Sequence, residues 1–586
     1  MSAAARALAP ARARARSGDR ARPRPPGWWP LALLTLLAAA LRLSTLDLQS
    51  FWYDEAFTPV HVLHAGLGAT LRAMAHSENT PPLWYVIAWA DARAFGTGEV
   101  ALRWPSALAG IATVPLAWAI GAELEAWPRA GRRVRGAALA CAALVAVNPL
   151  FVWYSQEARA YGLFVFTAAL ATLCFLRALR EPTPRRMTAF ALGGAVALLS
   201  HYFAAFLLLG MALALLCSAR ARRPALPALL ALALVGAALM PLVSAQGGHG
   251  TQWIGRWPLR ERLQAIPQYY LTGYSGQPLG HGVELLVALP ILAALAFGLW
   301  RIWRSQRAGG GHGAGGGHGA GGGHGAGGGH GADGGAGAGV GAGAGRQAAG
   351  ARGVDDGLAA GAGRAWQRTA LSRLAAVVCV LACGVLAPVL LAALGADYLA
   401  PRNLVAAMVP LTAAIAAIAA WPGGGRAGWA LAALVALGFL AVSVDVDLSP
   451  RLQRGDWRGV AQALRAAPAG GRSGGPAGGR AYAITTVELG SAPLEYYLPG
   501  LHELREGAAV RVSEIDETGY APLRASAGEP PAPGFRLRAR LDVHGLIVYR
   551  FVSPRPLAVS ERTLREHVIT LAAPFVLVPS GAHVSM

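Results

Sequence analysis

The sequence has 586 residues, of which 54% are hydrophobic and 14% are charged, against roughly 25% charged residues in an average soluble domain. A soluble protein of this composition could not cover its surface with polar groups, so the excess apolar residues must face lipid or one another. Apolar runs that approach the roughly 20 residues needed to cross a bilayer recur from Trp28 to Ala441. We therefore expect a polytopic membrane protein, and a collagen, a disulfide scaffold and a fully disordered chain are excluded.

The net charge of +21 does not indicate a nucleic-acid partner. The sequence contains no lysine, so all 52 basic residues are arginine, and they lie between the apolar runs, where membrane topology places them. The five cysteines all lie inside apolar segments and form no CxxC metal motif, which predicts small core residues rather than a disulfide framework.

The chain begins with arginine-rich residues 1–27, which we expect to be cytoplasmic, ahead of a retained first span. Later arginine clusters also belong on the cytoplasmic side by the positive-inside rule. Placing them there requires about eleven spans, with the N-terminus in the cytoplasm and the C-terminus outside. These spans are expected at 28–48, 100–124, 137–153, 161–178, 188–201, 203–217, 225–244, 282–300, 373–394, 403–421 and 427–443. The apolar stretch 81–96 is too short to span comfortably and predicts a re-entrant or interfacial helix.

Two regions differ from the spans in composition. Residues 308–364 carry a GGGHGA-type repeat, which predicts a flexible cytoplasmic linker, with weak metal chelation by its histidines as the alternative. From about Asp445 the composition becomes that of a soluble domain, in which short apolar runs alternate with polar turns. This pattern predicts a small extracytoplasmic α/β domain. The expected organisation is a basic segment 1–27, a membrane module 28–300, a linker 301–370, a second membrane part 371–444 and a soluble domain 445–586.

The segment Phe51-Trp52-Tyr53-Asp54-Glu55-Ala56 directly follows the first expected span, on the outer face. Of two carboxylates beside aromatic rings, one can accept a proton from a hydroxyl nucleophile while the other orients a ligand or a metal. The same segment is also compatible with a helix N-cap whose aromatic neighbours lie at the membrane interface.

Further polar motifs follow in order, and all fall on the expected outer face. They are His76–Tyr85 with its Pro-Pro pair, Leu102-Arg103-Trp104-Pro105-Ser106-Ala107-Leu108, Tyr154-Ser155-Gln156-Glu157-Ala158-Arg159-Ala160-Tyr161, His201-Tyr202 and Tyr398-Leu399-Ala400-Pro401-Arg402-Asn403. This ordered series resembles the GT-C membrane glycosyltransferases, specifically the bacterial branch of the protein O-mannosyltransferase and aminoarabinose-transferase superfamily. The resemblance covers about residues 28–445 and implies a GT-C transmembrane helical bundle.

The resemblance implies transfer of a sugar from a polyprenyl-phosphate carrier, with inversion at the anomeric carbon. Asp54 matches the position of the catalytic base, and Glu55 and Glu157 are expected to support it. Arg159 and Arg402 are expected to bind the donor phosphate, because guanidinium groups match phosphate oxygens. The residues expected to bind substrate are Tyr53, Glu78, Tyr154, Gln156, His201 and Tyr202.

One position departs from the family pattern. Some relatives bind a metal through an acidic residue near Glu78 and carry an adjacent lysine that faces the phosphate. Here Asn79 or Thr80 takes the place of that lysine, so arginine must bind the phosphate. A divalent cation is kept as an alternative cofactor, and the absent lysine argues against Glu78 as its ligand. Arg103 is expected to fix helix packing, and the outer loop 245–281 to cover the substrate.

Together these features predict a cell-membrane hexosyltransferase that uses mannose or a related sugar. Its expected partners are the polyprenyl-phosphate-linked donor, membrane lipid and a protein, lipid or polysaccharide acceptor. A transporter or lipid flippase without transferase activity is the alternative, and it would show inverted repeats, which the sequence lacks. A non-catalytic scaffold is a third reading, in which the outer-face carboxylates and arginines would be replaceable.

Overall fold

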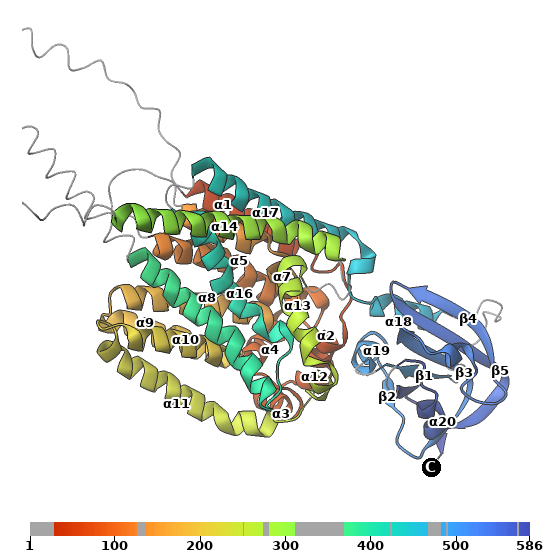
Figure 1. Ribbon diagram of the computed structural model, residues 1–586. Coiled ribbons are helices and arrows are strands. Elements are labelled where there is room, and N and C mark those ends of the chain that lie inside the picture. Colours follow the sequence, from red (N-terminus) through yellow and green to blue (C-terminus); the bar gives the residue numbers. More distant parts are fainter. Residues whose placement is uncertain are drawn as a thin grey trace, which may run out of the picture.

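The computed structural model has two parts, a bundle of helices and a smaller α/β domain at the C-terminus (Figure 1). It describes residues 28–125, 136–249, 251–273, 280–310, 369–421, 425–466, 482–487, 490–570 and 573–585. The expected basic segment 1–27 and the Gly/His-rich repeat lie outside the described residues. The expected fold class, a mainly helical membrane bundle with a small C-terminal α/β domain, is confirmed.

Most helices of the bundle are long, and the short ones lie near one end of it (Figure 1). The bundle begins with α1 (Trp29–Leu43), α2 (Tyr53–Phe57), a π-helical turn (Thr58–Val62), α3 (Leu67–Ser77), α4 (Leu83–Phe95), α5 (Glu99–Glu125), α6 (Gly136–Val147), α7 (Pro149–Ser155), α8 (Tyr161–Arg180) and α9 (Pro184–Ser200). It continues with α10 (Ala204–Cys217), α11 (Arg222–Gln246), α12 (Gln252–Arg256), α13 (Leu259–Thr272), α14 (His281–Gly310), the helix Thr369–Ala393, a 3₁₀ turn η3 (Pro401–Ala407), α16 (Met408–Ala419) and α17 (Gly425–Leu448).

The described part of the chain has seven helices that are long and apolar enough to cross a membrane. A further candidate is the pair α6 and α7, which is bent by 55°. The helices α1 and α10 are apolar but shorter, with 15 and 14 residues. Each expected span coincides with one of these helices or with α9, so their helical character is confirmed, while the total of about eleven spans stays a prediction.

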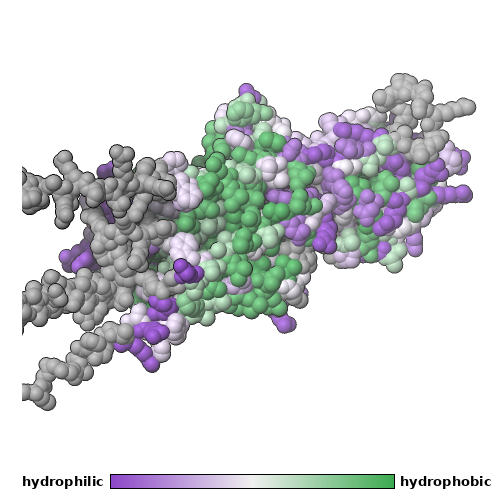
Figure 2. Space-filling view, turned by 90° about the horizontal axis from the view of Figure 1, so that it is seen from above, coloured by the Kyte–Doolittle hydropathy of each residue, from purple (hydrophilic) through white to green (hydrophobic). Residues whose placement is uncertain are grey.

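The bundle has an interior and a periphery that differ in burial. The segment Pro401–Ala419 has 83% of its most apolar window buried, against 11% for α11, so α16 lies inside the bundle and α11 at its edge. On the face seen in Figure 2, the helical part carries a broad apolar band with hydrophilic residues on either side of it. This distribution matches a lipid-facing surface.

The bend between α6 and α7 has a local cause. Pro149 starts α7, and the Asn148 side chain accepts the backbone N–H groups of Leu150 and Phe151 at 3.1 and 3.3 Å. On the other side of the bend, Arg42 of α1 donates to the carbonyl oxygens at the end of α6. Both helix ends are therefore satisfied, and α7 ends at Ser155, within the expected motif Tyr154–Tyr161.

The C-terminal domain is built on one sheet with the strand order β2-β6-β1-β3-β5-β4 and with β7 paired to β3. The β1–β3 pair is parallel and the other pairs are antiparallel. An apolar cluster lies on each face, and the cluster under α18 and α19 also includes Trp52 of the membrane module. The elements are a 3₁₀ turn (Pro450–Leu452), α18 (Trp457–Arg465), β1 (Tyr482–Thr486), α19 (Ser491–Tyr497), β2 (Leu501–Glu503), β3 (Ala509–Tyr520), a 3₁₀ turn (Ala525–Gly528), β4 (Arg536–Val543), β5 (Leu546–Ser560), α20 (Glu561–Glu566), β6 (Phe575–Pro579) and β7 (Val584–Ser585).

Candidate active site

The short helix α2 directs two neighbouring carboxylates to different surroundings. Trp52 is extended and precedes α2, whose first turn carries Asp54 and Glu55. Successive residues of a helix are rotated by about 100°, so Asp54 lines a cavity while Glu55 is fully buried on another side of the helix. The paired carboxylates of the sequence motif therefore have separate environments.

Asp54 pairs with an arginine that lies 348 residues later in the sequence. The Nη1 atom of Arg402, in η3, lies 2.7 Å from Asp54 Oδ2. Both side chains remain partly exposed, at 13% for Asp54 and 20% for Arg402, so both can be reached from the cavity. The ring of Trp253 lies 4.9 Å from the Arg402 guanidinium carbon and covers one side of it.

Arg159 pairs with Glu78 next to Asp54. Its Nη1 and Nη2 atoms donate to the two Glu78 oxygens, each at 2.9 Å, which is a bidentate pair. Nη1 also donates to the Asp54 carbonyl oxygen at 3.2 Å. The two carboxylates and two arginines at this wall of the cavity therefore balance one another in charge.

Glu55 is held by Arg103 rather than directed at the cavity. Arg103 Nε and Nη2 donate to the two Glu55 oxygens at 2.7 and 2.6 Å, and the Ala158 N–H donates at 2.8 Å. Burial opposes ionisation, but the charges of Arg103 and Arg454 lower the pKa of Glu55. Arg103 is fully buried as well, in agreement with its expected packing role, and the pair joins α2 to α5.

Glu157 lies in the turn between α7 and α8, behind the cavity wall. It is buried and its Oε2 accepts from Arg454 Nη2 at 3.0 Å, whereas its Oε1 has no hydrogen-bond partner among the described residues. Burial raises the pKa of Glu157 from 4.5 to about 7 against the opposing charge of Arg454, and the nearby charges of Glu55 and Asp54 raise it further. Glu157 therefore stands near the midpoint of its titration at neutral pH.

The cavity has a volume of about 480 Å³ and lies among α2, α10, α11, α12, η3 and the end of the helix Thr369–Ala393. Most of the sequence-predicted residues line it, and they come from segments far apart in the chain. Those that line it are Tyr53, Asp54, Glu78, Arg159, His201, Tyr202 and Arg402, whereas Glu55, Tyr154, Gln156 and Glu157 do not.

The turn between α9 and α10 contributes His201 and Tyr202 to the cavity. His201 stacks on Phe164 with the ring centroids 4.5 Å apart, and its Nδ1 accepts the Phe203 N–H at 3.2 Å. The Tyr202 hydroxyl donates to Gln246 Oε1 at 2.7 Å. These contacts fix the turn and leave both side chains at the cavity surface.

Tyr154 and Gln156, expected to bind substrate, lie behind the cavity. The Tyr154 ring is buried against Tyr161, which itself lines the cavity, with the centroids 4.8 Å apart. Gln156 Nε2 donates to the Leu41 carbonyl at 2.9 Å and to Thr45 Oγ1. Tyr154 thus supports Tyr161 at the wall, whereas Gln156 ties its turn to the end of α1.

The donor set does not fit a divalent cation. In the part of the chain that the structure describes, no group of three or more His, Cys, Asp or Glu residues is placed to hold a metal. Both oxygens of Glu78 are bound by Arg159. Arginine is therefore the cation that these residues offer to a phosphate group.

Sequence reasoning missed Arg454 altogether. This residue lies in the chain that enters the C-terminal domain, yet its side chain is 6% exposed and reaches Glu157 in the membrane module. No local motif marks it, because its partner is 297 residues away. The signal that could have found it is a group of three arginines, Arg451, Arg454 and Arg458, between the last expected span and the soluble domain, on the face expected to lie opposite most arginine clusters.

Residues 79–244 match a family model described as dolichyl-phosphate-mannose-protein mannosyltransferase. The resemblance to this superfamily is confirmed. The matched region contains Glu157, Arg159, His201 and Tyr202, and it stops short of Asp54 and Arg402. A search of curated proteins gives no match.

Two solved structures match this chain at low identity. ArnT from Cupriavidus metallidurans bound to undecaprenyl phosphate has a TM-score of 0.45 and 10% identity, over 89% of this chain and 98% of that one. The oligosaccharyltransferase AglB from Archaeoglobus fulgidus, in complex with an inhibitory peptide and a dolichol-phosphate, has a TM-score of 0.39 and 14% identity, over 80% of this chain and 63% of that one.

Proposed function

We propose that this protein is an inverting glycosyltransferase that moves a hexose, mannose or a related sugar, from a polyprenyl phosphate to an extracytoplasmic acceptor. The observation that carries the proposal is the 2.7 Å pair of Asp54 and Arg402 at the wall of a cavity. A base and a phosphate-binding cation are the two groups that this reaction needs. The mannosyltransferase family match of residues 79–244 supports the same reaction class.

The cavity also offers a surface for a lipid carrier. One part of its lining is apolar and comes from the helices α10 and α11 and from Thr369–Ala393. This part is formed by Phe206, Val243, Pro388 and Leu391. An isoprenoid chain against these side chains would have its phosphate toward the polar wall that holds Arg402.

The transfer requires one bond to form as another breaks. The acceptor hydroxyl oxygen attacks the anomeric carbon, the bond from that carbon to the phosphate oxygen breaks, and its electron pair leaves with the polyprenyl phosphate. The hydroxyl proton passes to Asp54. Arg402 and Arg159 stabilise the negative charge that develops on the leaving phosphate, which is where fixed cations lower the barrier most.

Donor binding and activation of the base are linked in this site. Asp54 and the donor phosphate both need the Arg402 guanidinium, which holds Asp54 when no phosphate is present. A phosphate that draws Arg402 away leaves the Asp54 carboxylate free to accept a proton. Proton removal is then coupled to the presence of the donor.

The charges of the cavity favour a neutral sugar. Among the described lining residues the only carboxylates are Asp54 and Glu78, and both are paired with arginines. A cationic amino sugar would need a further carboxylate, whereas a neutral hexose needs hydrogen-bonding groups such as Asn79 and Asn403, which line the cavity. We therefore expect hexose donors to be used in preference to amino-sugar donors.

The test replaces Asp54 with asparagine, which keeps the shape and removes the basic oxygen. We expect Asp54→Asn to lower turnover by about 100-fold or more, since loss of a general base costs about 10²–10⁴-fold. The measurement is release of polyprenyl phosphate from a radiolabelled hexose donor by the purified full-length protein. Asp445→Asn is the matched control, because Asp445 is exposed near the end of α17 and its carboxylate accepts only a local hydrogen bond from Ser449 in the described part of the chain.

Full turnover by Asp54→Asn would overturn this mechanism. Movement of the lipid between leaflets, without any release of polyprenyl phosphate from hexose donors, would instead support the transporter alternative. Equal loss of activity in Asp445→Asn would show that removal of any carboxylate on this face impairs the protein.

A further inference from the structure

The chain between α1 and α2 forms neither helix nor strand, although it determines where Asp54 lies. Residues 44–52 consist of turns and extended backbone, and α2 is only five residues long. Such a segment has no regular helix or strand hydrogen bonds of its own, and Arg103 of α5 holds it from the membrane side by donating to the carbonyl oxygens of residues 46, 49 and 50 at 2.8, 2.7 and 3.1 Å. Its position must therefore depend on the elements packed against it.

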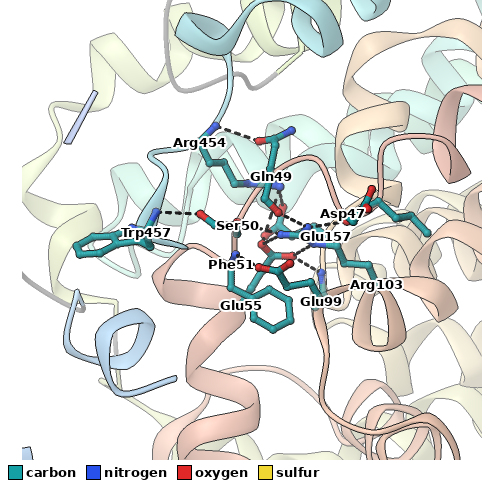
Figure 3. A network of polar contacts seen from close by, with 12 residues as sticks. Asp47, Gln49, Ser50, Phe51, Glu55, Glu99, Arg103, Glu157, Arg454 and Trp457 are labelled. Atoms are coloured by element: carbon teal, nitrogen blue, oxygen red, sulfur yellow. Dashed lines mark hydrogen bonds and ion pairs between the residues drawn. The ribbon is translucent and has the colours of Figure 1, made fainter. Parts of the chain in front are cut away.

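The segment that leads into the C-terminal domain holds this chain through its backbone. The Arg454 N–H donates to Gln49 Oε1 at 3.0 Å, and the Trp457 N–H donates to Ser50 Oγ at 2.9 Å (Figure 3). Ser50 Oγ in turn donates to the Gly455 carbonyl at 3.2 Å. These hydrogen bonds join segments about 405 residues apart in the sequence.

The side chain of Arg454 extends the contact into the membrane module. It donates to Glu157 at 3.0 Å and lies 4.0 Å from Glu55 (Figure 3). Its guanidinium carbon lies 5.6 Å from the Trp52 ring centroid and 4.2 Å from that of Trp153. The arginine is thus enclosed by two carboxylates and two indoles, a buried arrangement that fixes its geometry.

A second contact from the same domain holds the next residue of the chain. The Phe51 N–H donates to the Tyr497 hydroxyl of α19 at 2.7 Å, and that hydroxyl also bonds to Glu99 of α5. Arg458 of α18 pairs with the other Glu99 oxygen. The C-terminal domain therefore holds residues 49–51, directly before Trp52, through hydrogen bonds.

From this geometry we infer that Arg454 is a positioning residue for the transfer reaction, and that the C-terminal domain completes the active site by holding Asp54 opposite Arg402. The inference rests on the proposed function and adds a residue to it. Arg454 does not line the cavity, so it acts through the chain 49–55 rather than on the substrate. Misplacement of a reacting group by about 1 Å can cost about 100-fold in rate.

The experiment compares Arg454→Met and Arg454→Lys in the full-length protein. We expect Arg454→Met to lower kcat by about 100-fold while KM for the hexose donor stays within a factor of about three, because Arg402 and the apolar lining are intact. Arg454→Lys keeps a charge near Glu157 but loses the guanidinium fork, so its kcat should be intermediate. Binding of labelled polyprenyl phosphate gives a second measurement that does not depend on turnover.

Arg562→Met is the matched control, since the Arg562 side chain is 83% exposed on α20 and pairs with Glu566 of the same helix. We expect its kcat and KM to equal those of the wild type. An unchanged kcat in Arg454→Met would overturn the inference. A parallel loss of polyprenyl phosphate binding and turnover would also overturn it, because Arg454 would then maintain the cavity as a whole. A wild-type protein that transfers no sugar would contradict the proposed function instead.

Discussion

Single residues at this site differ in role mainly through the direction in which they point. Asp54 and Glu55 are neighbours in sequence, yet one pairs with Arg402 at the cavity and the other with buried Arg103. The motif predicted a chemical role for both, because a sequence shows that carboxylates lie together but not which helix face meets a cavity. Arg159 and Arg402 were expected to bind the donor phosphate, because guanidinium groups match phosphate oxygens. Both line the cavity, and phosphate binding by them stays a prediction.

Glu157 gives a prediction about pH and stability. Its pKa of about 7 in the folded protein lies above its ordinary 4.5, so the protonated form is favoured on folding. The stabilisation from protonation is complete below about pH 4.5 and is lost as the pH rises through 7. Glu157→Gln resembles the protonated state, so its melting temperature in detergent should match the wild type near pH 5 and exceed it near pH 8.

Thermal unfolding followed by intrinsic tryptophan fluorescence at both pH values measures this difference. Glu181→Gln is a suitable control, because Glu181 is 57% exposed and its replacement should change melting equally at both pH values. A Glu157→Gln variant that melts below the wild type at pH 8 would show that the pair with Arg454 outweighs the cost of burial.

At the scale of elements, the apolar runs predicted where the helices lie. The turn expected at Ser200–Tyr202 is present between α9 and α10, and the stretch 81–96, expected to be a re-entrant or interfacial helix, forms the helix α4. The bend at Asn148 was not predicted, because hydropathy continues through it, although Asn followed by Pro is a typical helix start. The short helices α12 and α13 within the expected outer loop were also missed, since their sequence is more polar and carries no span signal.

The contact between α5 and α7 supplies a prediction at this scale. A Cβ atom at Gly110 of α5 would lie 2.7 Å from Ser155 Cβ and would overlap its hydroxyl. Gly110→Ala should therefore destabilise the protein by about 1–3 kcal/mol through overpacking and displace the turn that carries Arg159. Gly236→Ala on α11 is the matched control, because nothing lies within 4 Å of its Cβ position.

Both glycine variants are compared with the wild type by their melting temperature and their transfer activity. Gly236→Ala should be neutral or stabilising, by up to ~1 kcal/mol, because alanine has the higher helix propensity. Equal melting of the two variants would mean that α5 and α7 can separate without cost.

At the scale of the whole molecule, the C-terminal domain lies at the same end as the cavity and the short helices (Figure 1). The opposite end carries Arg177, Arg180 and Arg373 around Glu123. The positive-inside rule assigns such a basic end to the cytoplasm. Domain order along the chain could be predicted from composition, whereas the contact of the C-terminal domain with α2 could not, because it joins residues far apart in sequence.

This arrangement predicts the orientation of the protein in the membrane. A phosphatase reporter that is active only outside the cytoplasm should be active when fused after Met586. The same reporter fused within the loop that joins α8 to α9, at Pro182, should be inactive. The reverse pattern would place the cavity on the cytoplasmic side and would contradict an extracytoplasmic acceptor.

The hydrogen bonds between residues 49–50 and 454–457 have a consequence for how each copy of the protein matures. Translation at ~5–20 residues per second separates the synthesis of these segments by roughly 20 to 80 s. During that interval the nascent chain already has α1 and α2, but it lacks the partners that hold them at their final distance from η3. The segment 454–457, which leaves the ribosome later, thus holds residues 49–50, so a chain that ends before residue 454 would lack the hydrogen bonds that position α2.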